Sequence, residues 1–403
     1  MHLRKKLFIV GLIFFAEGFP FGFLWDTLPV YFRIHGLSLR AIGFMSILSL
    51  PWSFKFLWAP AVDGIGQYRY WMGTCQLLMA IAVAALTFIS PSSGSLPLWL
   101  CLMTLAFLAA TQDIAIDAYS IEILETREMG VANGIRVSTY RVALLVAGGL
   151  FVAFGGWVGW RWCILLAACF IGLFSIYSFL LPPIQASRGQ GSAIVIIEPL
   201  RDLLKRPRAL QVLAFIFLYK LGDMAMGPMV RPFWVDRGLS TTEIGFITGT
   251  VGIVASISGA LIGGGFTSRF GIFHGLWFLG LWQAVSNLGY AVVAHLPQTG
   301  HWGVYCASLI ESFCGGLGTA AYLAFLMSIC NKRWAATQYA LLSALFGIAR
   351  SLAGSLSGWA TAGLGYGSYF TITFFLALPA YLLIMTVRPW LNECTLPGGE
   401  GGE

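Results

Sequence analysis

The chain has 403 residues, of which 58% are hydrophobic and only 10% are charged. Its mean hydropathy is +0.79. This composition excludes a soluble globular protein and predicts a polytopic membrane protein. The formal net charge of +7 does not indicate nucleic-acid binding, because the basic residues are distributed along the chain as membrane topology requires. We therefore expect a lipid bilayer, and no nucleic acid, as the partner of this chain.

Apolar runs close to the roughly 20 residues that cross a bilayer recur about twelve times along the chain. In chain order they lie near residues 7–32, 41–62, 71–90, 97–120, 131–156, 161–182, 209–236, 242–266, 271–296, 301–328, 335–361 and 366–388. The first run follows three basic residues and has no small-residue cleavage site after it, so we expect a retained helix and not a signal peptide. The runs leave no segment for a soluble catalytic domain.

Basic residues are concentrated in alternate loops between the predicted spans. With the N-terminus in the cytoplasm, the cytoplasmic side holds Arg4, Lys5, Lys6, Arg69, Arg127, Arg188, Arg201, Lys205, Arg206, Arg208, Arg269, Lys332, Arg333 and Arg388. The other side then holds only Arg33, Arg40, Arg161 and Arg237. Because Lys and Arg favour cytoplasmic loops, this imbalance predicts that both termini are cytoplasmic.

The two halves of the sequence repeat one pattern. Gly36-Leu37-Ser38 leads to Ile42-Gly43-Phe44, and 202 residues later Gly238-Leu239-Ser240 leads to Ile244-Gly245-Phe246. An offset of six spans predicts two parallel six-helix bundles related by an axis along the membrane normal. This arrangement resembles the major facilitator fold, so we expect an all-α membrane protein with 12 transmembrane helices. The predicted divisions are an N-terminal six-helix bundle (1–182), a cytoplasmic linker (183–208), a C-terminal six-helix bundle (209–390) and a flexible cytoplasmic tail (391–403).

Ionisable residues inside the spans are unevenly distributed. They are Glu17, Asp26, Lys55, Asp113, Asp117, Arg136, Arg141, Lys220, Asp223, Arg231, Glu311 and Arg350, and the third, sixth, ninth and twelfth spans have none. A charge at the centre of a membrane helix costs at least about 2.5 kcal/mol, so such residues indicate ion pathways, solute contacts or paired gates. The spared helices are the lipid-facing ones in a major facilitator bundle, which agrees with the predicted fold.

Depth within a span follows from the rise of about 1.5 Å per residue and a hydrocarbon core about 30 Å thick. On this measure Glu17, Arg141 and Lys220 lie about 15 to 17 Å from the cytoplasmic ends of their spans, near the midplane where transporter sites lie. Asp223 and Glu311 also lie near the middle. Lys220 and Asp223 share one helix face. They are either a functional pair, which exchanges its partners when a proton or an anion arrives, or a static pair that makes two buried charges tolerable.

Asp113 and Asp117 are one helical turn apart, but depth separates them. Asp113 is expected to face a central cavity, whereas Asp117 lies near the cytoplasmic end of its span, close to Arg136. Asp117 is therefore either a gate residue or part of a structural salt bridge that closes the cytoplasmic mouth. The loop from Asp63 to Arg69 resembles the major facilitator signature loop, with Ala59 in place of its first glycine. We expect Asp63, Arg69, Asp117 and Arg136 to form a cytoplasmic gate.

Several stretches together resemble the muropeptide permeases, or AmpG family, of the peptide/acetyl-coenzyme A transporter group. They are Leu50 to Pro60, Gln112 to Asp117, Tyr140-Arg141 with Gly148-Gly149, Pro199 to Asp202, Leu218-Tyr219-Lys220-Leu221-Gly222-Asp223, Ser286 to Tyr290, Glu311 with Cys314 to Gly316, Cys330 to Lys332 and Ala336 to Leu345. The resemblance covers nearly the whole chain. It implies proton-driven import of anhydro-muropeptides across the bacterial inner membrane, and hence a part in peptidoglycan recycling.

The resemblance also keeps alternatives open. Longer muropeptide permeases carry additional C-terminal helices, whereas this sequence continues only into a polar tail after the twelfth predicted span, and twelve-span members of the same group include siderophore importers. A membrane-embedded enzyme or a non-transporting sensor belongs to a different class. We find no nucleophile-plus-base arrangement and no His or Cys cluster with metal-ligand spacing. The sequence therefore predicts neither an enzyme nor a metal or other cofactor.

For a symporter of a bulky polar solute, we expect Glu17, Asp113 and Asp223 to carry protons. Arginine offers a bidentate fork and lysine a mobile point charge for solute carboxylates. The predicted solute-binding residues are Arg141, Lys220, Glu311, Arg350, Gln112, Tyr119 and Tyr219. The tyrosines would stack on sugar rings, although aromatic side chains in membrane helices more often pack in the core. We expect a monomer.

Overall fold

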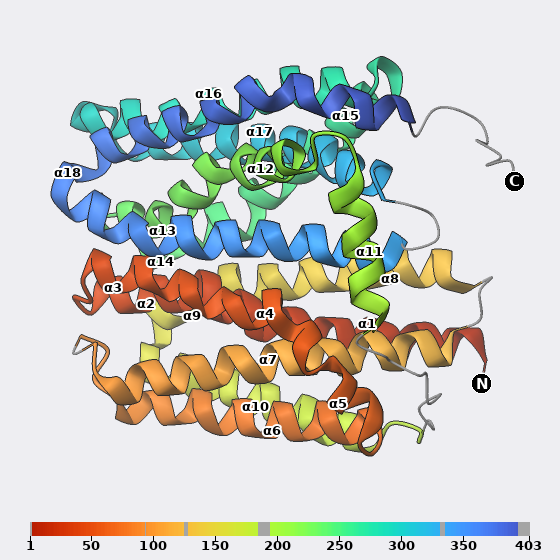
Figure 1. Cartoon of the computed structure of the whole chain (residues 1–403). Helices are drawn as coiled ribbons and strands as arrows, with labels where there is room; N and C mark the ends of the chain where they lie inside the picture. The colour runs from red at the N-terminus through yellow and green to blue at the C-terminus, as the bar shows by residue number, and fades with distance from the viewer. Residues whose placement is uncertain (1, 93, 125–127, 184–193, 331–334, 394–403) are drawn as a thin grey trace, which may run out of the picture. The chain divides into compact units, whose positions relative to one another are not determined.

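The computed structural model describes residues 2–92, 94–124, 128–183, 194–330 and 335–393, and the regular elements in these ranges are all helical (Figure 1). The chain divides into two compact units. Unit 1 consists of Met1–Gly191 and Arg231–Thr250, and unit 2 of Ser192–Val230 and Val251–Glu403. The boundary at Arg231 falls inside one helix, so a short segment from the second half of the sequence belongs to unit 1.

Unit 1 begins with a continuous helical segment from Leu3 to Ile34. It comprises α1 (Leu3–Gly22), the π-helical turn η1 (Phe23–Thr27) and α2 (Leu28–Ile34). Pro20 lies inside α1 just before the π turn. Because proline has no N–H to donate within a helix, a local change of helical register at this point is expected. The register change places Asp26 on the π turn itself.

The second predicted span is not one straight helix. It consists of α3 (Leu39–Phe44), η2 (Met45–Ser49), α4 (Leu50–Phe54), η3 (Lys55–Leu57) and α5 (Ala59–Gly64). Prolines in the first turns of α4 and α5 explain the interruptions, because a proline disfavours helical backbone in the residue before it. Lys55 therefore lies on a 3-10 turn between two short helices.

The remaining helices of unit 1 are long. They are α6 (Tyr68–Ala85), α7 (Leu96–Ile123), α8 (Met129–Leu144), α9 (Phe151–Val158) and α10 (Trp160–Phe179). A 3-10 turn, η4 (Leu86–Phe88), follows α6, and a π-helical turn, η6 (Leu145–Leu150), joins α8 to α9. Helix α6 packs against both α7 and α10, and α1 packs against α8. Ile13, Phe14, Met72 and Tyr119 belong to the hydrophobic core between these helices.

The second half of the chain contains α11 (Ile194–Lys205), α12 (Ala209–Tyr219), α13 (Leu221–Asp236), α14 (Thr241–Phe246), η7 (Ile247–Val251), α15 (Gly252–Phe270), α16 (Ile272–His295), η8 (Pro297–Thr299), α17 (Gly300–Ser328) and α18 (Ala335–Glu393). In unit 2, α17 packs against α15 and α16, and α18 against α12 and α16. A Cβ atom at Gly259 would lie 2.0 Å from the carbonyl oxygen of Phe313, so a glycine is required for this approach of α15 to α17.

Within the described ranges, ten helices are long and apolar enough to cross a membrane by length and hydropathy alone. One of them, Leu341–Leu391, is 51 residues long because α18 carries both the eleventh and twelfth predicted spans. The backbone of α18 breaks at Gly365, where φ is +77°. Glycine adopts positive φ without steric cost, and this break lies between the predicted runs 335–361 and 366–388. Division of α18 at Gly365 gives eleven segments. The interrupted second run, which is not among the ten helices, is the twelfth, so the segments correspond to the twelve predicted runs.

Two of the predicted segments outside the bundles contain helical residues. The predicted linker (183–208) contains helix α11, which its polar composition did not suggest, and residues 184–193 lie outside the described residues. The predicted tail begins at residue 391, but α18 continues to Glu393, and residues 394–403 are likewise outside the described ranges. Proline at position 389 is tolerated within this last part of α18.

A buried ion pair joins the start of the first span to the start of α8. Lys6 Nζ lies 2.7 Å from Glu128 Oε2, and the two side chains are only 8% and 10% exposed. We expect the Glu128→Gln substitution to destabilise the protein by about 3 to 5 kcal/mol, because it removes the countercharge of a buried ammonium group. Thermal unfolding in detergent measures this effect. The exposed Glu198→Gln substitution is the control, and equal melting temperatures of the two variants would contradict the prediction.

Candidate functional site

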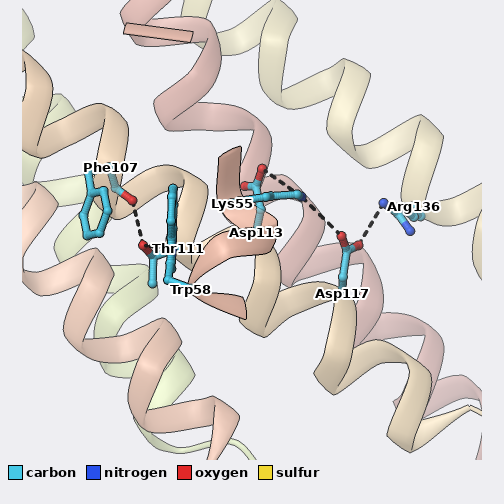
Figure 2. A network of polar contacts seen from close by, with 7 residues as sticks. All are labelled: Lys55, Trp58, Phe107, Thr111, Asp113, Asp117 and Arg136. Atoms are coloured by element: carbon cyan, nitrogen blue, oxygen red, sulfur yellow. Dashed lines mark hydrogen bonds and ion pairs between the residues drawn. The ribbon is translucent and has the colours of Figure 1, made fainter. Parts of the chain in front are cut away.

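Unit 1 contains a cluster of four charged side chains (Figure 2). Lys55 Nζ lies 3.9 Å from Asp113 Oδ2 and 3.8 Å from Asp117 Oδ2. Arg136 Nη2 lies 2.9 Å from Asp117 Oδ1. We call Lys55, Asp113, Asp117 and Arg136 the Lys55 cluster. Its two carboxylates and two cations balance in charge.

The local structure explains how these side chains meet. Asp113 and Asp117 are one turn apart on α7, so they share a helix face. The interrupted second span brings Lys55 to that face on a 3-10 turn, and α8 supplies Arg136. The side chain of Asp113 is 11% exposed, whereas those of Asp117 and Arg136 are 33% and 43% exposed. The cluster therefore extends from the interior of unit 1 toward its surface.

Glu17 on α1 is the third carboxylate of this region. It interacts electrostatically with Asp113, Asp117, Lys55 and Arg136. Its Oε2 atom is buried and has no hydrogen-bond partner among the described residues. Glu17 adds one negative charge to a balanced cluster, so a single proton would restore neutrality.

The sequence placed Asp113 deeper than Asp117, and the exposed fractions of their side chains, 11% and 33%, agree with that order. Lys55 contacts both carboxylates, so they belong to one cluster. Lys55 itself was not among the predicted site residues. The sequence did contain an indication of its role. Lys55 is a cation in an apolar segment, and Pro51 and Pro60 interrupt the helix on either side of it.

The predicted gate residues fall into two places. Asp117 and Arg136 are paired within the Lys55 cluster. Arg69 contacts other groups: its guanidinium donates to Gln67 Oε1 at 2.8 Å and to the Leu181 carbonyl at 3.1 Å. Arg69 therefore ties the start of α6 to the end of α10. The backbone of Asp63 lies in the last turn of α5, and its side chain lies outside what the structure describes.

The other predicted solute-binding residues of unit 1 differ in accessibility. Gln112 is buried, its Nε2 donates to the Ala16 carbonyl at 3.0 Å, and its Oε1 has no partner within the described residues. Tyr119 is fully buried in the core, and its hydroxyl donates to the Pro182 carbonyl. Arg141 is exposed on α8. Beside the cluster, Trp58 Nε1 donates to Thr111 Oγ1 at 3.1 Å (Figure 2).

Unit 2 contains a second buried charge cluster. Lys220 Nζ donates to Thr319 Oγ1 at 2.9 Å and lies 3.4 Å from Asp223 Oδ2. Lys220 lies at the non-helical junction between α12 and α13, and its side chain is 7% exposed. Glu311 on α17 acts on it electrostatically. We call Lys220, Asp223, Thr319 and Glu311 the Lys220 cluster.

Helix α16 adds uncharged polar groups to unit 2 that the sequence analysis missed. Gln283, Ser286 and Asn287 are each at most 5% exposed. Asn287 faces Asp223, yet neither polar atom of its amide has a partner at hydrogen-bond geometry among the described residues. The ninth predicted span contributed no predicted site residue, because it has no charged residue. Polar residues at positions i, i+3 and i+4 of an apolar helix were the overlooked indication.

The two remaining predicted residues of unit 2 have different surroundings. Tyr219 is a core residue that stacks on Tyr322, with ring centroids 5.3 Å apart, and donates to the Leu276 carbonyl at 2.8 Å. Arg350 is half-buried in α18. Among the described residues, no group of three or more His, Cys, Asp or Glu side chains gathers in a way that could hold a metal.

Two further ion pairs hold Arg231–Thr250 against the rest of unit 1. Arg231 Nη2 donates to Asp26 Oδ1, and Arg33 Nε donates to Asp236 Oδ1 at 2.6 Å while its Nη2 contacts Asp236 Oδ2. We call these pairs the ion-pair latch. They lie toward the end of the first span that is opposite the N-terminus. None of these four residues was among the predicted site residues.

Backbones approach closely beside the latch. A Cβ atom at Gly245 would lie 2.5 Å from the carbonyl oxygen of Gly149, and one at Gly149 would lie 2.7 Å from the Cα atom of Gly249. The side chain of Trp157 also donates to Thr242 Oγ1 at 2.8 Å. The ion pairs therefore border a contact that depends on glycine.

The comparisons with known proteins first define the class. The sequence profile of the Major Facilitator Superfamily matches residues 7–354. A bacterial homologue of the human lysosomal transporter Spinster, in an inward-facing and unoccupied conformation, superimposes with a TM-score of 0.79 at 13% identity, covering 98% of this chain and 99% of the other. The nucleoside transporter NupG superimposes with a TM-score of 0.73 at 16% identity, covering 97% of this chain and 99% of the other. The predicted major facilitator fold is confirmed, and the chain is a multi-pass membrane protein of a transporter superfamily, not an enzyme.

The sequence relatives narrow the family. The anhydromuropeptide permease of Escherichia coli K12 is 33% identical in an alignment that covers 95% of this chain and 80% of the permease. The chain therefore belongs to the AmpG-like muropeptide permease family of the major facilitator superfamily, as the sequence motifs predicted.

Proposed function

We propose that this chain is a proton-coupled symporter that imports anhydro-muropeptides across the bacterial inner membrane by alternating access. The observation that carries the proposal is a buried or partly buried charge cluster in each unit of a chain that aligns over 95% of its length with an anhydromuropeptide permease. The proposal includes cytoplasmic termini, two six-helix bundles divided as the sequence predicted, and a monomer.

In unit 1, Glu17 and Asp113 are the proposed proton carriers. Because the Lys55 cluster balances without Glu17, a proton can load onto this region without leaving a net charge in the membrane. The graded exposure from Asp113 to Asp117 supplies a polar route between the interior and the surface of unit 1. Asp117 and Arg136, with Asp63 and Arg69 on the signature loop, are the proposed cytoplasmic gate.

In unit 2, Asp223 is the proposed carrier and Lys220 the group that responds to it. Lys220 is shared between the Asp223 carboxylate and the Thr319 hydroxyl. Protonation of Asp223 removes the charge attraction between the two, so the ammonium becomes available to a solute carboxylate. The Asn287 amide can donate to an ionised Asp223 or accept from a protonated one, which suits a group that changes protonation state.

The proposed solute contacts are Lys220, Glu311, Gln112, Arg141 and Arg350. Lysine and arginine would bind the carboxylates of the peptide stem, and the Gln112 amide has an unsatisfied oxygen for a sugar hydroxyl. Tyr119 and Tyr219 are not part of this set, because both are buried and their hydroxyls already donate to backbone carbonyls.

Uptake into proteoliposomes tests the function. With an imposed inward proton gradient, labelled anhydro-muropeptide should accumulate, and a protonophore should abolish accumulation. Unlabelled anhydro-muropeptide should compete and a ferric siderophore should not. Accumulation of the siderophore instead would identify the other substrate class of this group. Saturable binding without accumulation under any gradient would contradict transport and favour a sensor.

A further inference from the structure

Helix α11 is amphipathic and lies across the direction of the membrane-spanning helices of unit 2. Figure 1 shows α11 running transverse to α12 and α18. The turn between α11 and α12 includes Arg208, whose φ is +58°, the one non-glycine residue with positive φ among the described residues. Because left-handed backbone is unfavourable for such a residue, it persists only where its surroundings fix it.

One edge of α11 is fixed to unit 2. Arg206 Nη2 lies 3.1 Å from Asp202 Oδ2, and Gln338 Nε2 donates to the same carboxylate oxygen at 2.7 Å. The guanidinium of Arg206 also lies 5.1 Å from the centre of the Trp390 ring, whose Nε1 donates to the Pro207 carbonyl at 2.7 Å. Leu203 is 1% exposed in the same core. These contacts set the rotation of the helix about its axis.

The opposite edge of α11 is left exposed by that rotation. Leu200 and Leu204, one turn apart, are 39% and 47% exposed. Arg201 and Lys205, also one turn apart, are exposed beside them. Exposed Arg208 follows, and Leu210 in the first turn of the membrane-spanning α12 is 77% exposed. An apolar row therefore runs alongside a basic row at the level where a bilayer-spanning helix begins.

We propose that this edge of α11 binds anionic phospholipid of the membrane leaflet from which α12 enters the bilayer. Leu200 and Leu204 would contact the acyl-chain boundary, as the apolar face of an interfacial helix does. Arg201, Lys205 and Arg208 would pair with lipid phosphates, because basic side chains near an anionic membrane surface are attracted to it. The exposed Glu198 is the acidic residue of this edge, and the three basic residues outweigh it.

The choice of lipid over other partners follows from position and chemistry. The edge continues into a helix that lies in the bilayer, so hydrocarbon and headgroups are adjacent to it without any binding partner. A soluble phosphate would use the basic row but not the leucines. Lipid is the class of ligand that uses both rows.

Native mass spectrometry of the full chain in detergent tests this proposal with phosphatidylglycerol and phosphatidylcholine as probes. We expect the wild-type chain to bind phosphatidylglycerol in preference to phosphatidylcholine. The Arg201→Gln/Lys205→Gln variant should bind phosphatidylglycerol about tenfold more weakly. The Leu200→Ser/Leu204→Ser variant should also bind more weakly, and Glu198→Gln should bind at least as tightly as wild type.

The matched control is Arg40→Gln/Arg161→Gln, which removes the same charge from exposed positions elsewhere. It should bind phosphatidylglycerol like the wild type. Equal loss in the control and in the α11 variant, no preference over phosphatidylcholine, or displacement by inorganic phosphate at millimolar concentration would each overturn the proposal. Unchanged size-exclusion profiles establish that the variants are folded. Because the measurement involves no transport, its outcome is independent of the proposed function.

Discussion

The Lys55→Met substitution is expected to reduce proton-driven uptake at least about tenfold and to lower the melting temperature. It removes the cation that lies between Asp113 and Asp117, so two carboxylates in a partly buried site lose their shared countercharge. Initial rates in proteoliposomes with an imposed pH gradient measure the first effect, and thermal unfolding measures the second. Lys5→Met, at an exposed position of α1, is the matched control and should change neither quantity.

A second substitution separates charge balance from proton transfer. In the Lys55→Met/Asp113→Asn variant the remaining Asp117 and Arg136 again balance, so the melting temperature should recover most of its loss. Uptake should not recover, because Asp113 is a proposed proton carrier. If uptake returns together with stability, the cluster is a structural group of balanced charges and carries no proton in transport.

The fold was predictable because its determinants are local or periodic. Apolar runs of spanning length, the offset of 202 residues between the halves and the boundary between the runs 335–361 and 366–388 can all be found in the sequence without spatial information. The second span shows the limit of that approach. Its hydropathy marks a segment of spanning length, but prolines divide it into short helices, and hydropathy does not report backbone geometry.

The candidate site was predictable in part. Charged residues in apolar spans identified Glu17, Asp113 and Asp223, since their cost in a membrane is independent of the fold. The depth measure ordered Asp113 and Asp117 but did not predict that Lys55 contacts both, because depth along one helix says nothing about side chains from other segments. Asn287 was missed because it has no charge. Tyr119 and Tyr219 show the reverse error, since a sequence does not distinguish an aromatic ring in a core from one at a binding surface.

The ion-pair latch could not be predicted from the sequence. Its partners are 205 residues apart for Asp26 and Arg231, and 203 apart for Arg33 and Asp236. No spacing rule connects residues at such distances, and only the packing of Arg231–Thr250 on unit 1 brings them together. In the proposed transport cycle this contact must separate for solute to enter from the side opposite the cytoplasm.

Reversal of one charge in the latch should open this contact. We expect Asp26→Arg, which sets a second guanidinium against Arg231, to increase exposure of the neighbouring backbone about tenfold, since an ion pair with partners 24% and 17% exposed is worth about 1 to 2 kcal/mol. The reporter is Ala153→Cys in a chain whose native cysteines are replaced, because Ala153 is 7% exposed and packs against Gly245. The rate of its labelling by a membrane-impermeant maleimide measures opening.

The charge swap Asp26→Arg/Arg231→Asp restores opposite charges at the same positions. Labelling at position 153 should then return close to the rate of the reporter alone, and uptake, which we expect Asp26→Arg to impair, should return with it. A single Arg231→Asp variant should behave like Asp26→Arg. Recovery in the swap shows that the attraction between the two side chains, and not the identity of either, holds the contact closed. If the single variants label as slowly as the reporter chain, or if the swap labels as fast as they do, the latch does not control access.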